Sequence, residues 1–317
     1  ALDNTSQRVA PISIPGAPTG RSNADIHAIQ AWEETLGTSD VVIAVIDTGV
    51  DLNHPDILNK LVSNGKDFIN NDDKADDDEG HGTHVAGIAA AESNNDIGVA
   101  GVAWNCKILP VKAFGPGGEG DTKAVTDSLL WAVEQNVDVI NMSWGGNLGY
   151  GRKVSLTIEG ALKMAYEKNI VLVAASGNHD DYVFYPASSD YTLAVAATDF
   201  NDSRPTWSNP GPEVDVAAPG DWIVSLYPLS LTPSQFAPYA WWSGTSMSTP
   251  YVSGLAALIK SIKPLLSVKD IMNIIRYSAD DVNSTNHPGK DDYIGYGRIN
   301  MKKALVPLIL QPSRQNP

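Results

Sequence analysis

The chain has 317 residues, 43% of them hydrophobic, and its 22 Lys+Arg against 37 Asp+Glu leave a formal net charge of −15. This apolar content excludes intrinsic disorder, and no apolar run approaches the roughly 18 residues that a membrane span needs. Because the sequence shows no basic patch, its negative charge disfavours binding to nucleic acids and to anionic lipid surfaces. Cys106 is the only cysteine, which excludes an intrachain disulfide and a multi-cysteine metal site, so we expect a soluble globular protein that binds peptides, neutral molecules or cations.

The chain begins with a segment unlike the rest. Residues 1–22 are rich in Pro, Ser, Gly and Asn without periodicity, and they predict an extended arm. Because Ala1 follows neither a basic nor an apolar leader, we expect a processed mature form, compatible with secretion to the extracellular space. Residues 23–306 show one composition class and no repeats, which predicts a single domain, and residues 307–317 predict a C-terminal tail.

From residue 24 onward, stretches with helical spacing of apolar residues alternate with short β-branched runs. The predicted helices are Ala24–Leu36, His81–Glu92, Asp121–Gln135, Val154–Lys168, Ser246–Lys263 and Ser267–Ser278. The predicted strands are Val41–Ile46, Cys106–Val111, Val137–Met142, Ile170–Ala175 and Thr192–Ala196, with a late hairpin of Val224–Leu226 and Tyr239–Trp242. Runs that are apolar at consecutive positions are typical of strands buried on both faces. The alternation predicts an α/β fold with a doubly wound, mostly parallel sheet flanked by helices.

Reactive side chains stand where buried elements of this sheet begin or end. Asp47 directly follows a strand, His81 opens a helix of small residues, and Ser246 begins another such helix. Ligands gather beyond the carboxyl ends of the strands in this architecture. Each residue alone could be a helix cap or a packing residue, but together they indicate a nucleophile, a base and an orienting acid.

These segments carry a resemblance to a known family. Asp-Thr-Gly at 47–49, His-Gly-Thr-His-Val-Ala-Gly at 81–87 and Gly-Thr-Ser-Met-Ser-Thr-Pro at 244–250 match the signatures of the subtilisin family, and the pattern resembles its thermitase-like branch over roughly residues 23–306. The resemblance implies a broad-specificity serine endopeptidase with a subtilisin-like fold. It also implies a monomer that cleaves peptides or proteins and is paired with a propeptide or a protein inhibitor.

The resemblance assigns roles to the catalytic residues. His81 takes the proton of the Ser246 hydroxyl as it attacks the peptide carbonyl, and Asp47 orients His81. Asn178 and a backbone N–H bind the oxyanion of the acyl-transfer intermediate. His84, one turn after His81, is expected to be a packed helix histidine.

The resemblance also implies the substrate cleft. Gly118, Glu119 and Gly120 form one edge and Ser143, Trp144 and Gly145 the other, so that an extended peptide pairs with both. Ser143–Gly145 and Ala175–Gly177 wall the main specificity pocket, with Phe184 near its base. We expect Phe184 to shorten this pocket and to favour small or medium apolar side chains.

Calcium is the implied cofactor, with a structural role, at two loops rich in oxygen ligands. The first resembles the family's high-affinity loop, with the side chains of Asp56 and Asn95 and the carbonyls of Ser93, Ile97 and Val99; Asp3 of the arm is a further candidate. The second uses the positions of Asp67, Asn70, Asp72 and Asp76, where neighbouring acids would repel one another unless neutralised.

Two other classes of function stay open on sequence alone. A catalytically silent relative would bind peptides along the same edges without cleaving them. Residues 115–120 satisfy G-x-G-x-x-G between a predicted strand and helix, which is compatible with a nucleotide-dependent oxidoreductase. Against the latter, Glu119 and Asp121 would face the pyrophosphate, and Asp138 opens its strand instead of ending it.

Overall fold

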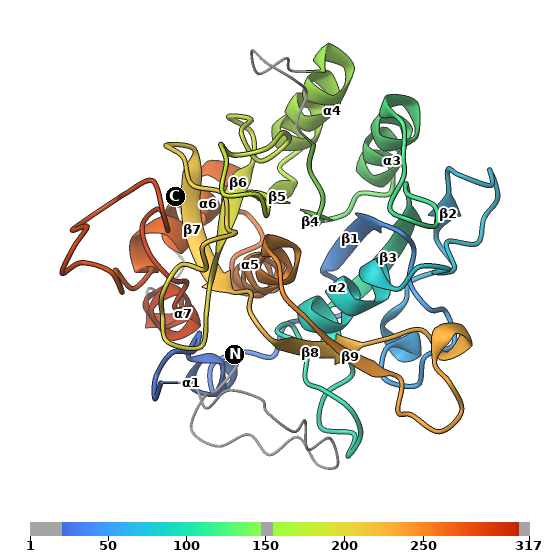
Figure 1. Ribbon diagram of the computed structural model, residues 1–317, viewed down its shortest axis with the longest axis horizontal. Helices are drawn as coiled ribbons and strands as arrows, with labels where there is room; N and C mark the ends of the chain where they lie inside the picture. The colour runs from blue at the N-terminus through green and yellow to red at the C-terminus, as the bar shows by residue number, and fades with distance from the viewer. Residues whose placement is uncertain (1–20, 147–154, 311–317) are drawn as a thin grey trace, which may run out of the picture.

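The computed structural model describes residues 21–146 and 155–310 (Figure 1). Most of the predicted arm, Asp3 within it, Val154 at the predicted start of the fourth helix, and the chain beyond 310 lie outside the described residues. In the described part, no helix is both long and apolar enough to cross a membrane.

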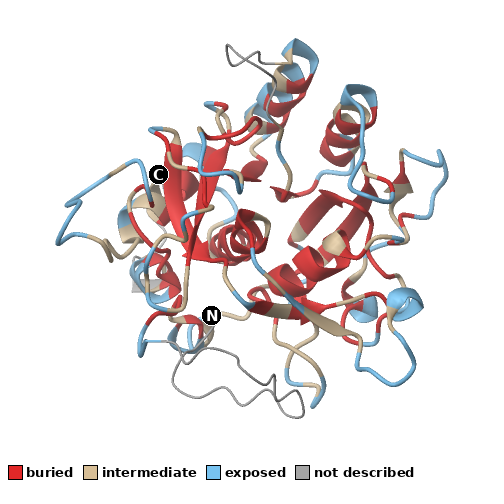
Figure 2. Cartoon of the chain, in the orientation of Figure 1, coloured by how far each residue is buried: buried red, intermediate tan, exposed pale blue. Residues whose placement is uncertain are grey.

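A parallel sheet of seven strands forms the centre of the molecule, in the order β2-β3-β1-β4-β5-β6-β7. Its strands are β1 (Val42–Asp47), β2 (Lys66–Asp67), β3 (Lys107–Lys112), β4 (Val139–Met142), β5 (Val171–Ala175), β6 (Leu193–Thr198) and β7 (Val214–Pro219). Nearly every residue in them is buried, as expected for strands covered on both faces (Figure 2). The predicted α/β fold class is confirmed.

Helices cover both faces of this sheet. They are α1 (Ala28–Trp32), α2 (His81–Ala90), α3 (Thr122–Glu134), α4 (Leu156–Glu167), α5 (Thr245–Ile262), α6 (Val268–Ser278) and α7 (Met301–Leu310), with short 3-10 turns at Leu58–Lys60 and Leu229–Leu231. In Figure 1, α3 and α4 lie on one side of the sheet and α2 and α5 on the other. Each face has its own apolar core, so the sheet separates two hydrophobic layers.

A second, antiparallel sheet of β8 (Ile223–Leu226) and β9 (Tyr239–Trp242) confirms the predicted hairpin. It packs on the start of α2, where Ser225 Oγ donates to the His84 carbonyl at 2.7 Å. The hairpin therefore connects the helix that carries His81 to the segment that leads into Ser246.

Several elements differ from the sequence-based predictions. The first helix spans five residues because His27 before it is in the left-handed region, at φ 56°, and the chain turns after Trp32. β7 was missed because Asp215 and Pro219 interrupt its apolar run; the Asp215 carboxylate is paired with Arg276 at 2.8 Å. β2 and α7 were also missed, and the tail predicted from residue 307 begins within α7.

The strand order determines where the candidate catalytic residues lie. β1 lies between β3 and β4, where the order of the strands reverses, and the carboxyl ends of parallel strands meet at one edge of the sheet. Asp47 ends β1, Ser143 follows β4 and Ser176 follows β5 at this edge. The candidate residues therefore converge although they lie far apart in the chain.

Candidate active site

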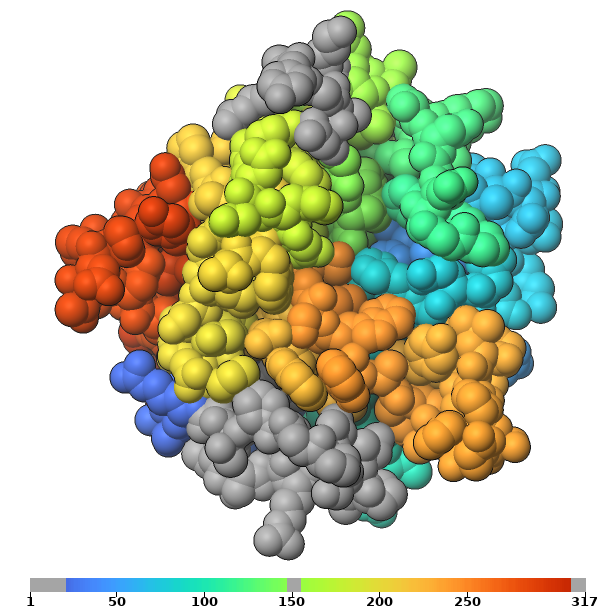
Figure 3. All heavy atoms as spheres, viewed as in Figure 1, coloured from blue at the N-terminus to red at the C-terminus, as the bar shows by residue number. Residues whose placement is uncertain are grey.

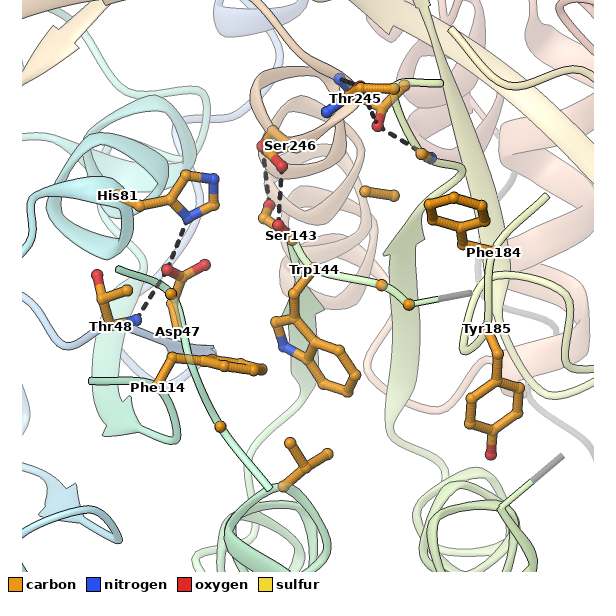
Figure 4. A pocket seen from close by; sticks show the side chains of 18 of the residues that line it. Asp47, Thr48, His81, Phe114, Ser143, Trp144, Phe184, Tyr185, Thr245 and Ser246 are labelled. Atoms are coloured by element: carbon orange, nitrogen blue, oxygen red, sulfur yellow. Dashed lines mark hydrogen bonds and ion pairs between the residues drawn. The ribbon is translucent and has the colours of Figure 1, made fainter. Parts of the chain in front are cut away.

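An acid and an imidazole are joined at the end of β1. Asp47 Oδ1 lies 2.7 Å from His81 Nδ1, and the same oxygen accepts the Thr48 N–H at 2.8 Å. Because a carboxylate oxygen can only accept, His81 Nδ1 carries the proton and Nε2 remains the atom that can act as a base. Figure 4 shows the imidazole standing between Asp47 and Ser246.

Burial and the nearby carboxylates have opposite effects on the pKa of His81. Burial disfavours the imidazolium, but the Asp47 carboxylate, both by its charge and by its hydrogen bond, and the more distant Glu79 and Asp77 favour it. The net result raises the pKa of His81 above its ordinary value. This environment stabilises the protonated state that a general base reaches during proton transfer.

Asp77 fixes the approach of α2 to β1. This buried carboxylate accepts hydrogen bonds from the Thr48 hydroxyl at 2.9 Å, from both the N–H and the hydroxyl of Thr83, and from the N–H groups of Glu79 and Gly80. Thr48 Oγ1 in turn accepts the Gly82 N–H at 2.9 Å. The first turn of α2 is thus tied to the residue after Asp47, which sets the distance between acid and imidazole.

Lys112 is a buried cation that hydrogen-bonds to the segment after Asp47 and to the loop before His81. It is 1% exposed, lies beside Asp47 in the register of β1 and β3, and donates to the Thr48 carbonyl at 2.7 Å and to Asp78 at 2.5 Å. A buried ammonium with two acceptors is a satisfied cation. Sequence reasoning missed this role because the lysine sits inside an apolar strand, with no motif around it.

Ser246 stands in the first turn of α5, which begins at Thr245, one residue before the prediction. Its hydroxyl donates to the Ser143 carbonyl at 2.8 Å, and the Ser143 hydroxyl donates to the Ser246 carbonyl at 2.8 Å. Ser246 and His81 line the same cleft, as Figure 4 shows. In this rotamer the hydroxyl points to the strand edge at Ser143 and not to the imidazole.

Asn178 is oriented by the residue that precedes Ser246. Its Oδ1 accepts both the N–H of Thr245 at 2.8 Å and the Thr245 hydroxyl at 2.9 Å. With the carbonyl oxygen occupied, the amide nitrogen is left as the donor that this side chain can offer to a bound substrate. Asn178, Ser246 and His81 all line one cavity of about 480 Å³.

The structure brings most of the predicted substrate residues to that cavity. Its lining includes the predicted residues Gly118, Gly120, Ser143, Trp144, Gly145, Ala175, Gly177 and Phe184. Glu119 differs: it is not part of the lining, and its carbonyl accepts the Gly115 N–H at 2.9 Å in a turn of its own loop. Figure 3 shows the face of the molecule around this cavity, with residues 81–122 in cyan to teal beside the green and orange segments.

Phe184 is buried against both walls of the predicted specificity pocket. A Cβ placed on Gly145 would lie 3.2 Å from Phe184, and one on Gly177 would lie 3.0 Å from it. His179, which sequence reasoning did not single out, lines the cavity and packs on the Phe184 ring with centroids 5.2 Å apart. The two rings together narrow this end of the cavity.

Trp242 covers the histidines of α2. Its ring is stacked on His84 at 4.8 Å and lies nearly parallel to His81 at 6.0 Å. His84 is fully buried, its Nε2 donates to the Ala240 carbonyl at 3.1 Å, and burial lowers the pKa of His84 to about 3. His84 is therefore a neutral packing residue, as expected, that fastens the hairpin to α2.

The first loop predicted to hold calcium closes on Asp56. This carboxylate is fully buried, accepts the Asn95 amide at 2.7 Å and the Val99 N–H at 3.0 Å, and has no Lys or Arg ion-pair partner among the described residues. Burial raises the pKa of Asp56, although these hydrogen bonds oppose the shift. A buried carboxylate without a cation, next to the amide and carbonyl oxygens of 93–99, matches the donors that Ca²⁺ prefers.

In the second loop predicted to hold calcium, several acidic side chains are paired with lysines, whereas Asp56 in the first loop has no such partner among the described residues. Asp67 is 2% exposed, and its oxygens accept the N–H of Ile69 and both the N–H and the side-chain amide of Asn70. The predicted ligand Asp76 is paired with Lys74 at 3.1 Å, and the neighbouring acids are paired with lysines too, at 2.8 Å for Lys66–Asp73 and 2.5 Å for Lys112–Asp78. Asp72 accepts the Lys74 N–H. Within the described residues, no group of three or more His, Cys, Asp or Glu side chains is placed to hold a metal ion.

The fold and the cleft are those of a subtilisin-like serine protease, and comparisons with known proteins place the chain within that class. The model of the subtilase family (Peptidase_S8) matches residues 38–297, so the chain belongs to the subtilase family. This result excludes the oxidoreductase alternative. Of the glycines at 115–120, Gly118 and Gly120 line the cleft.

Individual relatives agree with the thermitase-like branch. The chain is 41% identical to thermitase of Thermoactinomyces vulgaris over 88% of this chain and 93% of thermitase. It is 38% identical to the halolysin-like extracellular serine protease Nep of Natrialba magadii over 96% of this chain, and it spans only 55% of that longer protein. Among solved structures, a protease from Pseudoalteromonas arctica matches with a TM-score of 0.80 and 32% identity, over 90% of this chain and 94% of that one.

Proposed function

We propose that this chain is a serine endopeptidase that uses Asp47, His81 and Ser246 as a catalytic triad. The observation that carries the proposal is the imidazole of His81, bonded to a buried carboxylate on one side and facing a hydroxyl across the cleft on the other. A serine hydroxyl is a weak nucleophile at neutral pH and needs such a base.

The proposed reaction passes through an acyl-enzyme. Rotation about the Cα–Cβ bond turns the Ser246 hydroxyl from Ser143 toward His81 Nε2. The oxygen attacks the peptide carbonyl as its proton moves to Nε2, and collapse of the intermediate breaks the C–N bond while the proton passes to the leaving amine. Water then repeats the sequence and frees the acid. The Asn178 amide and the backbone N–H of Ser246 bind the oxyanion.

Hydrolysis of a chromogenic peptide tests this function. The wild type should cleave it, Ser246→Ala should abolish cleavage, and a serine-directed phosphonate should inactivate the wild type by reacting with Ser246. A silent peptide-binding relative would instead bind the peptide without cleaving it and would not react with the phosphonate.

The proposed substrates are extended protein segments that lie between Gly118–Gly120 and Ser143–Gly145. Pairing through the main chain makes the enzyme tolerant of sequence, and selectivity then depends on pockets. Because Phe184 packs closely against Gly145 and Gly177 in the walls of one pocket, small or medium apolar side chains should be preferred beside the cleaved bond. A peptide library in which Phe or Tyr is preferred at that position would overturn this assignment.

We also propose that calcium stabilises the fold and that the protein acts outside the cell as a monomer with a propeptide or protein inhibitor as its partner. The loop at 93–99 with Asp56 would hold the first ion, which would offset the buried carboxylate. Asp67, Asn70, Asp72 and Asp76 would form a second, weaker site, since lysines already pair with Asp76 itself and with the adjacent Asp73. Extracellular action is supported by the name of the related protease Nep.

A further inference from the structure

The charged residues that line the cleft are nearly all acidic. Among the described lining residues are the carboxylates of Asp47, Glu79 and Asp121, together with His81 and His179, and there is no Lys or Arg. Asp47 is engaged with His81. Neither of the other two carboxylates contacts the reacting atoms in the proposed mechanism, and Glu79 affects His81 through its charge.

Glu79 stands beside the catalytic histidine. One carboxylate oxygen, Oε2, accepts the backbone N–H of His81 at 2.9 Å, which fixes the side chain at the start of α2, and the residue is half-buried at the cleft. Its own N–H is held by Asp77 at 3.0 Å. The position of this carboxylate is therefore set by the fold.

Glu79 also differs from the neighbouring aspartates in having no lysine or arginine partner among the described residues. In the same loop, Asp73, Asp76 and Asp78 each lie within 3.1 Å of a lysine Nζ, whereas no Lys or Arg of the described residues forms an ion pair with Glu79. A half-buried carboxylate that faces a cavity without a counterion attracts a cation from outside more strongly than an exposed one does.

Asp121 is the second such carboxylate, and it lies next to the proposed substrate edge. Its Oδ1 caps α3 by accepting the Ala124 N–H at 2.7 Å, and it directly follows Gly120. No Lys or Arg of the described part of the chain forms an ion pair with it, because the nearby Lys123 is paired with Asp127 at 2.5 Å. Glu79 and Asp121 thus each add a negative charge to the lining of the cleft.

We infer that this enzyme selects polypeptides that carry a lysine or arginine on the N-terminal side of the cleaved bond, with Glu79 as the residue that binds the cation. The inference rests on the proposed function and names its substrate class. A charge-assisted contact at a half-buried site should raise kcat/KM for a lysine peptide roughly three- to ten-fold over a neutral one.

The test uses internally quenched peptides that differ at one position. Lys, Gln or Glu is placed in turn at each of the four residues before the cleaved bond, and kcat/KM is measured at a pH above the acidic limb of the wild type. At one position the wild type should prefer Lys over Gln roughly three- to ten-fold and disfavour Glu, and adding about 0.5 M NaCl should reduce the preference.

Glu79→Gln should bring the Lys/Gln ratio close to one. Glutamine keeps an oxygen that can accept the His81 N–H, and the ratio cancels any change in the catalytic step that affects both peptides equally. Glu134→Gln is the matched control: it removes one negative charge at the exposed far end of α3, about 20 Å from Asp121 along the helix, and should leave the ratio unchanged.

The possible failures are distinct. A wild type that cleaves the Lys and Gln peptides equally well at every position, or a Glu79→Gln variant that keeps the full preference, would overturn the inference while the protease function stands. If no peptide of the set is cleaved and the chromogenic substrate is also inert, the proposed function itself fails.

Discussion

Asn178 illustrates how one side chain can matter for turnover and little for stability. Its Oδ1 is held by two hydrogen bonds from Thr245, so the amide N–H₂ is aimed before substrate arrives. A donor positioned in this way acts on the charge that develops in the transition state and avoids reorganisation at that moment.

We expect Asn178→Ala to lower kcat by about 10²–10³-fold, the range established for the oxyanion donor of subtilisins and carried over to this chain. The Tm of the variant should stay close to that of the wild type. Thr245 is buried but lines the cleft, so water that enters the space left by the Asn178 amide can accept its hydrogen bonds. Steady-state kinetics with the chromogenic peptide and a thermal melt check both parts. A loss of less than about ten-fold would remove Asn178 from the oxyanion site.

The protonation of His81 is the second property that belongs to single residues. The base must be neutral to accept the Ser246 proton, and the acidic environment raises the pKa of His81. Activity should therefore fall as pH drops, with the acidic limb of kcat/KM centred above the ordinary histidine value of about 6.5.

Glu79→Gln should shift this limb toward lower pH, because removing a nearby negative charge destabilises the imidazolium. Glu134→Gln, at the exposed end of α3, serves as the control and should leave it in place. A shift toward higher pH in Glu79→Gln would show that this carboxylate does not act on His81 as a charge.

On the scale of elements, the close packing of α2 decides where His81 stands. Gly87 lies against β8, and a Cβ placed on it would be 2.4 Å from Ser225 Oγ and 2.6 Å from Leu226. The small residues of α2 thus let the hairpin approach the helix, and the hairpin in turn brings Trp242 over His81 and His84.

Gly87→Ala should destabilise the protein by about 1–3 kcal/mol through this overlap and lower activity by displacing the hairpin. Gly160→Ala is the natural comparison, since Gly160 lies in α4 with no atom within 4 Å of the added Cβ. That variant should be neutral or up to about 1 kcal/mol more stable, because alanine favours the helix. Chemical denaturation measures both, and equal effects would contradict the packing argument.

For the whole molecule, stability is tied to the loop around Asp56. The chain has one cysteine, which is buried, so no disulfide constrains the loops. A cation bound at Asp56 would stabilise the folded state by mass action and would lower the cost of burying this carboxylate.

Chelation should therefore lower the Tm by roughly 5–10 °C if the ion is present at about one hundred times its dissociation constant. Added calcium should restore the Tm, and Asp56→Asn should melt at a lower temperature and lose most of its response to calcium. Asp67→Asn, in the second loop, should keep most of the response. Identical melts with and without chelator would remove calcium from the account of stability.

Much of this molecule could be predicted from local sequence. The buried strands β1, β3, β4, β5 and β6 are continuous apolar runs, and the segments at 47–49, 81–87 and 244–250 are specific enough to indicate the family before any coordinates. β7 and α7 could not be found in this way, because Asp215 and Pro307 break their patterns. In β7 the buried carboxylate of Asp215 is tolerated because Arg276, distant in the chain, pairs with it.

By itself, then, the sequence determined the fold class and which acid, imidazole and hydroxyl to consider, since these follow from periodicity and from short motifs. Only the tertiary structure decided how these residues are held. The strand order reverses at β1 and so brings them together, and the buried Lys112 donates to the Thr48 carbonyl. Lysines neutralise the aspartates around Glu79, whereas Glu79 itself lines the cleft without a lysine partner among the described residues. The physical reason is that charge balance and burial depend on residues distant in the chain, whereas propensity and motif depend on residues close together.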